Sequence, residues 1–278
     1  METTKLMNDG HTIPRLGLGV WRLENDRAAD LVAEAIAAGY RHIDTAQGND
    51  NEEGVGHGIA GCGVPRTELF VTSKLRTSHH GHENTLLSFA ETMDRLALDY
   101  LDLFLIHWPV PQHDRYVEIW KALIELRETG RLRSIGVSNF TVPQLERLID
   151  ETGVVPAVNQ IELNPFFQQR ELRDFHREQG IVIESYSPLG GDGAVALRHP
   201  VVQQVAEKHS RSAAQVVIRW HLQQGLIVLP KTSKPERLAE NFSVWEFELN
   251  PAHMAALDAL DRPDGKVLPH PEQMNTLF

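Results

Sequence analysis

The chain has 278 residues, a length typical of one α/β barrel and sufficient to bury a large core. Its 41% apolar and 23% charged residues exclude a disordered chain. Its net charge of −11 argues against nucleic acids and anionic membranes as partners, because both require a basic surface.

The chain has a single cysteine, Cys62, which excludes an internal disulfide and predicts a reducing compartment. The N-terminal segment METTKLMNDGHTIP has no apolar signal region. No apolar run approaches the roughly 18 residues that span a membrane. We therefore expect a cytoplasmic protein. We also expect it to be a monomer whose partner is a small molecule.

Short apolar runs alternate with amphipathic segments along the chain. An NDG turn at 8–10 predicts a small hairpin before the first strand. Strands are expected at 16–20, 41–44, 69–74, 101–107, 134–139, 157–163, 181–186 and 226–231. Helical spacing of apolar residues is clearest at 26–39, 83–97, 115–130 and 212–225, and several of these segments end at glycine.

Eight strand-helix units in fewer than 280 residues predict a closed (β/α)8 barrel rather than an open sheet. We find no sequence repeat or low-complexity linker, so we expect one domain spanning residues 1–278. The hairpin should cap the barrel floor. The tail after Arg262 is rich in proline, glycine and histidine, and we expect it to form a loop over the barrel mouth.

Polar or aromatic residues end seven consecutive predicted strands. In such barrels functional groups lie at the carboxyl ends of the strands, which converge on one mouth. The residues at these ends are Asp44, Lys74, His107, Ser138 and Asn139, Gln160, Tyr186 and Lys231. The sequence therefore predicts a functional site at the mouth.

The segment GHGIAG at 56–61 matches the G-x-G-x-x-G dinucleotide pattern literally. That pattern binds pyrophosphate only in a strand-to-helix turn. Here it falls inside a predicted helix, about a dozen residues after its strand, so we reject it as a cofactor site.

Several segments together resemble the aldo-keto reductases, and particularly the bacterial 2,5-diketo-D-gluconate reductases. They include RHIDTA, NEEGVG, RLALD, HWP, RSIGVSN, TGVVPAVNQIEL and RWHLQ, and the likeness covers nearly the whole chain. The resemblance implies a (β/α)8 barrel that transfers hydride from NADPH to an aldehyde, ketone or keto-sugar. It also implies a catalytic tetrad of Asp, Tyr, Lys and His, three of which correspond to Asp44, Lys74 and His107.

The tyrosine position of that tetrad is occupied by Asn49. Reduction of a carbonyl leaves an alkoxide that must be protonated, and an asparagine amide releases no proton at any relevant pH. Loss of a positioned general acid costs typically about 10²- to 10⁴-fold in rate. The remaining donors are His107, if protonated, or a water molecule.

Three interpretations of the Asn49 substitution remain open. The chain is a reductase of reduced rate, a non-catalytic NADPH-binding or regulatory protein, or an active reductase in which a Tyr-to-Asn change was introduced or fixed recently. Retention of Lys74 and His107 weighs against the second interpretation.

The resemblance places the cofactor contacts late in the chain. They are Ser138, Asn139, Gln160, Tyr186, Ser187, Leu189, Lys231, Thr232, Ser233, Lys234, Arg237, Glu240 and Asn241. The two lysines and the arginine of KTSKPERLAEN suit an adenosine 2′-phosphate and so favour NADP(H) over NAD(H).

The pocket for the carbonyl substrate is expected at aromatic and basic side chains near the mouth. Trp21 and Trp108 should wall it, although isolated tryptophans are also typical of a core. Arg76 either favours an anionic substrate or is a surface loop residue. His79, His80 and His82 cluster in one loop without metal-ligand spacing, so we predict no metal site.

Overall fold

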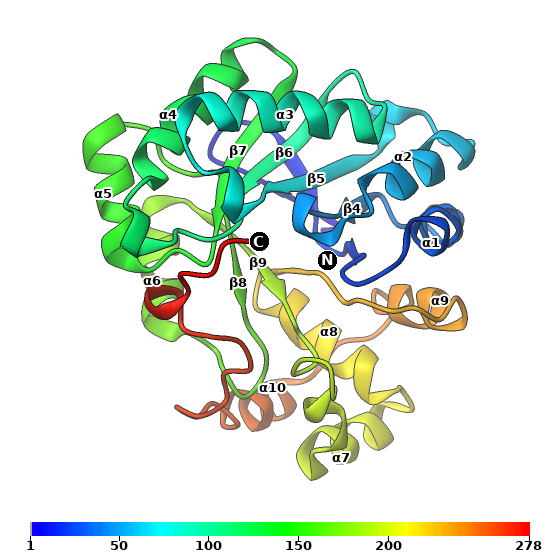
Figure 1. The fold of residues 1–278 in the computed structure, drawn as a ribbon. Helices are drawn as coiled ribbons and strands as arrows, with labels where there is room; N and C mark the ends of the chain where they lie inside the picture. The colour runs from blue at the N-terminus through cyan, green and yellow to red at the C-terminus, as the bar shows by residue number, and fades with distance from the viewer. Residues whose placement is uncertain (1) are drawn as a thin grey trace.

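The computed structural model describes residues 2–278, so Met1, within the domain expected at 1–278, lies outside it. Eight parallel strands surrounded by helices confirm the predicted (β/α)8 barrel (Figure 1). The barrel strands are β3 (Leu18–Gly19), β4 (His42–Asp44), β5 (Phe70–Leu75), β6 (Leu101–Ile106), β7 (Leu132–Ser138), β8 (Val158–Glu162), β9 (Val182–Tyr186) and β10 (Ile227–Val228). Each strand pairs with the next in chain order.

The barrel closes between its first and last strands. Leu16 bridges Val228, and Gly19 bridges Lys231, both in parallel. Each bridge joins a residue of one of these two-residue strands to a residue just outside the other, Val228 of β10 to Leu16 and Gly19 of β3 to Lys231. The predicted strands 16–20 and 226–231 are therefore present as pairing segments with shorter regular cores.

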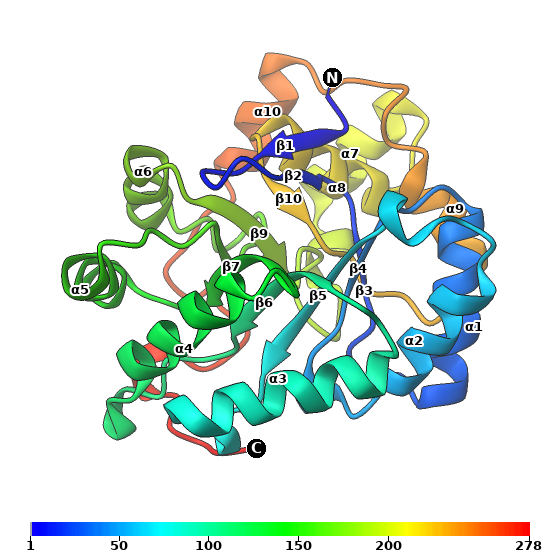
Figure 2. The same cartoon turned by 90° about the horizontal axis from the view of Figure 1, so that it is seen from above.

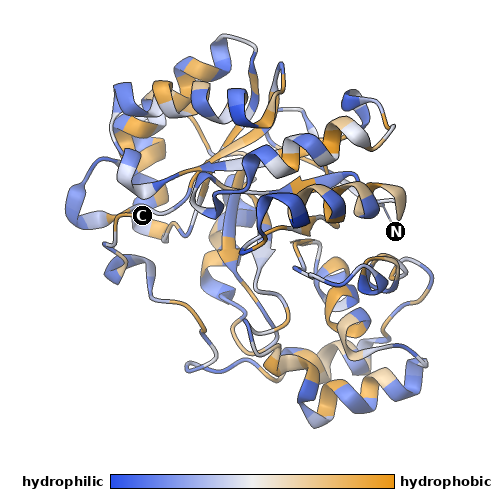
Figure 3. Cartoon of the chain, turned by 45° about the vertical axis from the view of Figure 1, so that its right-hand side comes forward, coloured by the Kyte–Doolittle hydropathy of each residue, from blue (hydrophilic) through white to orange (hydrophobic). Residues whose placement is uncertain are grey.

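Helices cover the outside of the barrel. They are α1 (Asn25–Ala37), α2 (Glu52–Gly61), α3 (His82–Leu96), α4 (Tyr116–Glu128), α5 (Val142–Thr152), α6 (Arg170–Gln179), α7 (Pro200–His209), α8 (Ala213–Gln223), α9 (Glu236–Phe242) and α10 (Pro251–Asp258). Hydrophobic and hydrophilic residues alternate along them (Figure 3), as expected for helices with one face on a core. None of the helices described in residues 2–278 is long and apolar enough to cross a membrane.

The GHGIAG segment lies inside α2, as predicted. Its glycines permit close helix packing. A Cβ on Gly56 would lie 2.3 Å from the carbonyl oxygen of Leu96, and one on Gly58 would lie 2.6 Å from that of Ala29. The motif therefore brings α2 against its neighbours.

The predicted hairpin consists of the antiparallel strands β1 (Thr4–Leu6) and β2 (Thr12–Pro14). It lies at the opposite end of the barrel from the C-terminus (Figure 2). Met7 and Ile13 are buried in one cluster with Phe70, Leu103 and Val158 of the barrel strands. The hairpin thus closes the barrel floor with an apolar layer, and the polar strand ends lie above it.

The tail after Arg262 crosses the barrel opening and ends near its centre (Figure 1), as predicted. Its only regular element in the described chain is the short turn Pro271–Gln273. Glu162, at the end of β8, accepts hydrogen bonds from the backbone N–H groups of Val267 at 2.6 Å and Leu268 at 2.9 Å. This buried carboxylate fixes the start of the tail to the barrel.

Candidate active site

Lys74 and Asp44 form a buried ion pair at the carboxyl ends of β5 and β4. Lys74 Nζ lies 2.8 Å and 2.7 Å from the two carboxylate oxygens of Asp44, and 2.8 Å from the carbonyl oxygen of Thr45. The exposed fractions of the two residues are 4% and 7%. An ammonium has three N–H donors, so these contacts satisfy the cation in a poorly solvated site.

His107 follows β6, and its side chain reaches the same mouth. Burial, the charge of Lys74 and the neighbouring His80 lower the pKa of His107 well below its ordinary value. Its Nδ1 has no hydrogen-bond partner among residues 2–278. The ring is therefore a neutral imidazole at physiological pH, which can donate a hydrogen bond but holds no extra proton to release.

Phe278 packs on the imidazole of His107. The two ring centroids are 5.4 Å apart in an edge-to-face arrangement. The Phe278 backbone is anchored to the turn after β5, because its N–H donates to Thr77 Oγ1 at 2.8 Å and its oxygen accepts from Ser78 N–H at 3.1 Å. The tail thus contributes an aromatic wall to the mouth.

Asn49 ends the short turn Gln47–Asn49 after β4 and is half-buried. Its amide Nδ2 makes one long contact, 3.5 Å from Thr45 Oγ1. Lys74 donates to the backbone carbonyl of the same Thr45, so Asn49 and Lys74 both contact this residue through different atoms.

The phenolic hydroxyls of the four tyrosines form hydrogen bonds away from the Lys74–Asp44 pair. Tyr40 donates to the Leu238 carbonyl, Tyr100 to the Arg66 carbonyl and Tyr186 to Asn139 Oδ1. Tyr116 Oη accepts from Arg147. No tyrosine hydroxyl within the described residues hydrogen-bonds Lys74 or Asp44.

The short polar groups predicted for the cofactor converge beside this ion pair. Asn139 Nδ2 donates to the His107 carbonyl and to Ser138 Oγ, each at 3.0 Å. Ser138 Oγ donates to the Gln160 carbonyl at 2.9 Å. Burial is the main cause that raises the pKa of Tyr186 well above its ordinary value, so its hydroxyl stays protonated and donates to Asn139 Oδ1 at 2.6 Å.

The residues predicted for the far end of the cofactor lie after β10 and on α9. Thr232 and Asn241 are buried, whereas Lys231, Ser233, Lys234, Arg237 and Glu240 are exposed. No ion pair joins the two lysines or Arg237 to another described residue. Ser187 and Leu189, in the loop after β9, are half-buried.

Arg76 is already paired within the chain. Its guanidinium forms an ion pair with Asp50 and donates to the Gln47 carbonyl at 2.8 Å. Its backbone N–H donates to Gln47 Oε1 at 2.8 Å. Arg76 therefore holds the turn that carries Asn49.

The two predicted pocket tryptophans differ in exposure, and two histidines of the 79–82 loop have separate partners. Trp108 is 6% exposed and Trp21 is 41% exposed, with the Arg22 guanidinium 4.0 Å from its ring centroid. His79 Nδ1 lies 2.9 Å from Ser88 Oγ, whereas His82 lies beside Glu125. Within residues 2–278, no group of three potential metal ligands comes together.

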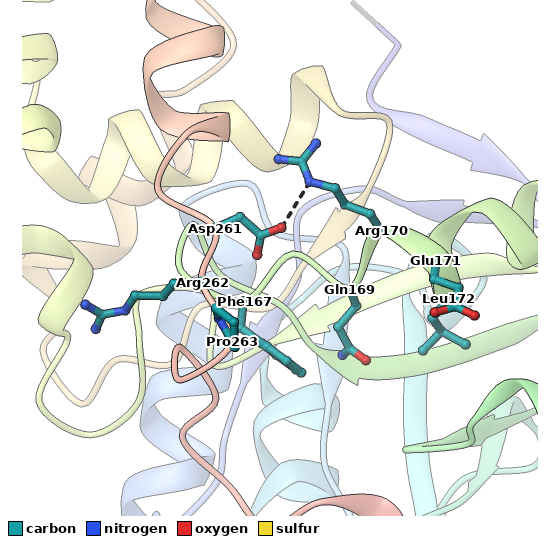
Figure 4. A pocket seen from close by; sticks show the side chains of 8 residues that line it. All are labelled: Phe167, Gln169, Arg170, Glu171, Leu172, Asp261, Arg262 and Pro263. Atoms are coloured by element: carbon teal, nitrogen blue, oxygen red, sulfur yellow. Dashed lines mark hydrogen bonds and ion pairs between the residues drawn. The ribbon is translucent and has the colours of Figure 1, made fainter.

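A pocket of about 440 Å³ lies away from the strand-end cluster, between the start of α6 and the start of the tail (Figure 4). Arg170 and Asp261 form an ion pair of 3.0 Å across its wall. None of the predicted site residues lines it. A smaller pocket of about 30 Å³ reaches Asn139.

Sequence reasoning missed two residues that touch the catalytic cluster. Glu184 on β9 hydrogen-bonds Gln160, and Phe278 packs on His107. A glutamate inside the apolar strand IVIESY was a usable signal for the first, whereas nothing in the sequence pattern indicated the second.

Comparison with known proteins finds similarity along nearly the whole chain. The profile of the Aldo/keto reductase family matches residues 15–262. An aldo-keto reductase of Mycobacterium sp. (strain KMS) is 50% identical over 270 residues, which cover 97% of this chain and 96% of the relative. Methylglyoxal reductase DkgA of Escherichia coli K12 is 46% identical over 268 residues, which cover 96% of each chain. The crystal structure of a Gox0644 mutant in complex with NADPH is 49% identical, covers 98% of each chain and superposes with a TM-score of 0.93.

Proposed function

This chain belongs to the aldo/keto reductase family, and we propose that it reduces aldehydes, ketones or keto-sugars to alcohols at a rate limited by Asn49. It is an NADPH-dependent oxidoreductase of small carbonyl compounds. The observation that carries the proposal is the buried Lys74–Asp44 pair beside His107, which places a fixed cation and a hydrogen-bond donor at the barrel mouth.

The residues present fit the cofactor. The amide nitrogen of Gln160 donates to the carboxyl groups of Asp44 and Glu184, which leaves its amide oxygen to accept from the nicotinamide carboxamide. Tyr186 offers a half-buried ring for the nicotinamide, with Ser138 and Asn139 at its edge. Lys231, Lys234 and Arg237 provide exposed cations that would hold the 2′-phosphate, and Glu240 and Asn241 would contact the adenine. Ser187, Leu189, Thr232 and Ser233 are the remaining proposed cofactor contacts. When bound, NADPH supplies the hydride.

The chain's own residues stabilise the charge that develops on the carbonyl oxygen. His107 is neutral, so it donates a hydrogen bond that orients the oxygen. The Lys74 ammonium favours negative charge nearby, because the site excludes water and Coulomb interactions are strong there. Asp44 balances the ammonium in the resting state.

Proton delivery is the weak step. Asn49 occupies the position where the family resemblance calls for a tyrosine, and its amide cannot release a proton. Because His107 is neutral, we assign the proton to a water molecule beside Asn49. The intact ion pair favours an impaired reductase over a non-catalytic NADPH-binding protein, since burying two charges costs stability that mere binding does not require.

We assign the walls of the substrate pocket to Trp21, Trp108 and Phe278. Trp108 is buried next to His107 in the sequence, whereas Trp21 is partly exposed after β3. Arg76 remains a candidate for attracting anionic substrates, but its ion pair with Asp50 would first have to open.

Two measurements test the proposed function. NADPH fluorescence should saturate at micromolar protein and show weaker binding of NADH. NADPH consumption should be slow but measurable with a panel of methylglyoxal, simple ketones and keto-sugars. Absence of saturable NADPH binding, or equal affinity for NADH, would refute the cofactor assignment, and no turnover on any carbonyl would favour the binding protein.

A further inference from the structure

Glu184 lies in the barrel interior directly beneath the catalytic ion pair. It precedes Tyr186 by two residues on β9, so both side chains point to the same face of the sheet. Its strand neighbours in register are Gln160 on β8 and Ile227 on β10. Glu184 is 0% exposed, and the established chemistry of the site assigns it no part.

Gln160 joins Glu184 to the catalytic carboxylate. Its Nε2 donates to Asp44 Oδ1 at 2.9 Å and to Glu184 Oε2 at 3.0 Å. A single amide nitrogen thus spans the two carboxyl groups. A change in the charge or position of Glu184 therefore alters the hydrogen bond that this amide donates to Asp44.

The second oxygen of Glu184 faces an imidazole. Glu184 Oε1 lies 3.4 Å from His42 Nε2 and has no donor among the described residues. His42 Nδ1 lies 3.3 Å from the Pro14 carbonyl, which can only accept, so Nδ1 carries the ring proton. Burial lowers the pKa of His42 to about 4, so the ring is neutral and its Nε2 presents a lone pair.

An ionised Glu184 would therefore direct an unpaired oxygen at a lone pair. Thr72 Oγ1 lies 3.2 Å from the same nitrogen, but a bond from the Thr72 hydroxyl to His42 would still leave Glu184 Oε1 without a donor. A protonated Glu184 resolves the contact, because its own O–H can be directed at His42.

Burial and the charge of Asp44 favour the same neutral state, and they outweigh the opposing effects of the Gln160 hydrogen bond and the Lys74 charge. His42 and Asp44 come from β4, Lys74 from β5 and the neutral Gln160 from β8, whereas Ile227 and Val228 of β10 bring no titratable group. The three donors of Lys74 are already engaged by Asp44 and Thr45. Burial, followed by the Asp44 charge, raises the pKa of Glu184 to about 8.

We propose that Glu184 is a positioning residue, held as a neutral carboxylic acid, that donates to His42 and fixes the Gln160 amide against Asp44. Asp44 is then the only negative charge paired with Lys74, and the ammonium retains its attraction for the oxygen of the reacting carbonyl. Ionisation of Glu184 adds a second negative charge and weakens that attraction. The inference deepens the proposed carbonyl reduction and rests on it for the kinetic test alone.

The protonation state can be measured without catalysis. With side-chain ¹³C-carboxyl glutamate incorporated, one resonance should titrate near pH 8, and the Glu184→Gln variant should lack it. Glu162→Gln is the matched control, because Glu162 is equally buried but accepts two backbone N–H bonds. That variant should keep the high-pH titration. If every glutamate carboxyl titrates in the ordinary range, the proposal is wrong.

Unfolding supplies a second measurement that does not depend on catalysis. The folded pKa of Glu184 is raised, so its contribution to stability is complete below the pKa of the unfolded chain and is lost as pH rises through about 8. The free energy of unfolding of Glu184→Gln, relative to the parent, should therefore increase with pH across that window. A pH-independent difference would overturn the assignment. If the variant does not fold, the carboxyl titration of the parent still decides.

The kinetic readout separates positioning from packing. In the Asn49→Tyr background, Glu184 ionisation should lower kcat by up to tenfold per pH unit above its midpoint. Glu184→Gln should reduce that alkaline fall, whereas Glu184→Leu should lower kcat across the whole pH range. If kcat falls identically at alkaline pH in Asn49→Tyr with and without Glu184→Gln, the positioning role is contradicted. Failure of Asn49→Tyr to reduce carbonyls would refute the proposed function and leave the carboxyl titration intact.

Discussion

Replacement of Asn49 by tyrosine should restore the missing general acid. Asn49 makes only one long contact, to Thr45 Oγ1, so its removal should cost the fold little. Lys74 also contacts Thr45, through its backbone carbonyl, and by the family resemblance we expect a phenol at position 49 to stand beside the ammonium. That cation lowers the pKa of a neighbouring phenol by favouring its phenolate.

The expected gain in kcat is about 10²- to 10⁴-fold, the usual contribution of a positioned general acid. This corresponds to about 2.7 to 5.4 kcal/mol of transition-state stabilisation. The gain should appear in kcat and kcat/KM together, because the acid acts mainly in the transition state. NADPH affinity should hardly change, since Asn49 contacts none of the residues assigned to the cofactor.

Steady-state NADPH oxidation with methylglyoxal and a keto-sugar is the assay. Lys74→Met provides the control: it should remove most of the gain in the Asn49→Tyr variant and cost much less in the parent. Turnover of Asn49→Tyr within a few-fold of the parent would refute the reasoning. The chemistry would then depend on another donor, or the function is not carbonyl reduction.

Three further predictions concern the cofactor, the substrate and acid stability. Lys234→Ala should weaken NADPH binding about tenfold or more, because it removes a charged partner of the 2′-phosphate. NADH binding should not change, and equal losses of affinity for both cofactors would argue against that contact. Arg76→Trp should lower activity on acidic relative to neutral carbonyl compounds, and an unchanged ratio would restrict Arg76 to holding its turn through Asp50. Burial lowers the pKa of His42, His80 and His221 to about 4 and that of His176 to about 3, so the unfolded chain binds protons that the folded chain excludes. The free energy of unfolding should therefore fall as pH drops from about 6.5 towards 4. Glu184, whose folded pKa is raised, opposes this fall by one proton only. Urea midpoints that do not change in this window would contradict the prediction.

Much of the barrel follows from local sequence patterns. Strands buried on both faces give continuous apolar runs, and β5 and β6 lie where such runs predict them. Strand ends converge in any parallel barrel, so the grouping of Asp44, Lys74 and Gln160 could be anticipated.

The contacts made by the loops and the tail, and the protonation state of Glu184, could not be anticipated. The pairing of Arg76 with Asp50 depends on how two loops fold across the mouth. The packing of Phe278 on His107 depends on the path of a tail without regular structure, which Glu162 anchors through backbone N–H groups that have no sequence signature. The protonation of Glu184 depends on which nitrogen of His42 carries its proton, and only the Pro14 contact determines that.

Single-turnover oxidation of NADPH tests the central claim most directly. The unaltered protein, saturated with NADPH and mixed with excess methylglyoxal, should oxidise the bound cofactor completely but slowly. The rate constant should be about 10²- to 10⁴-fold below that of Asn49→Tyr under the same conditions. Equal rate constants for the two proteins, or no NADPH bound before mixing, would contradict the conclusion that this chain is a reductase limited by the missing acid at position 49.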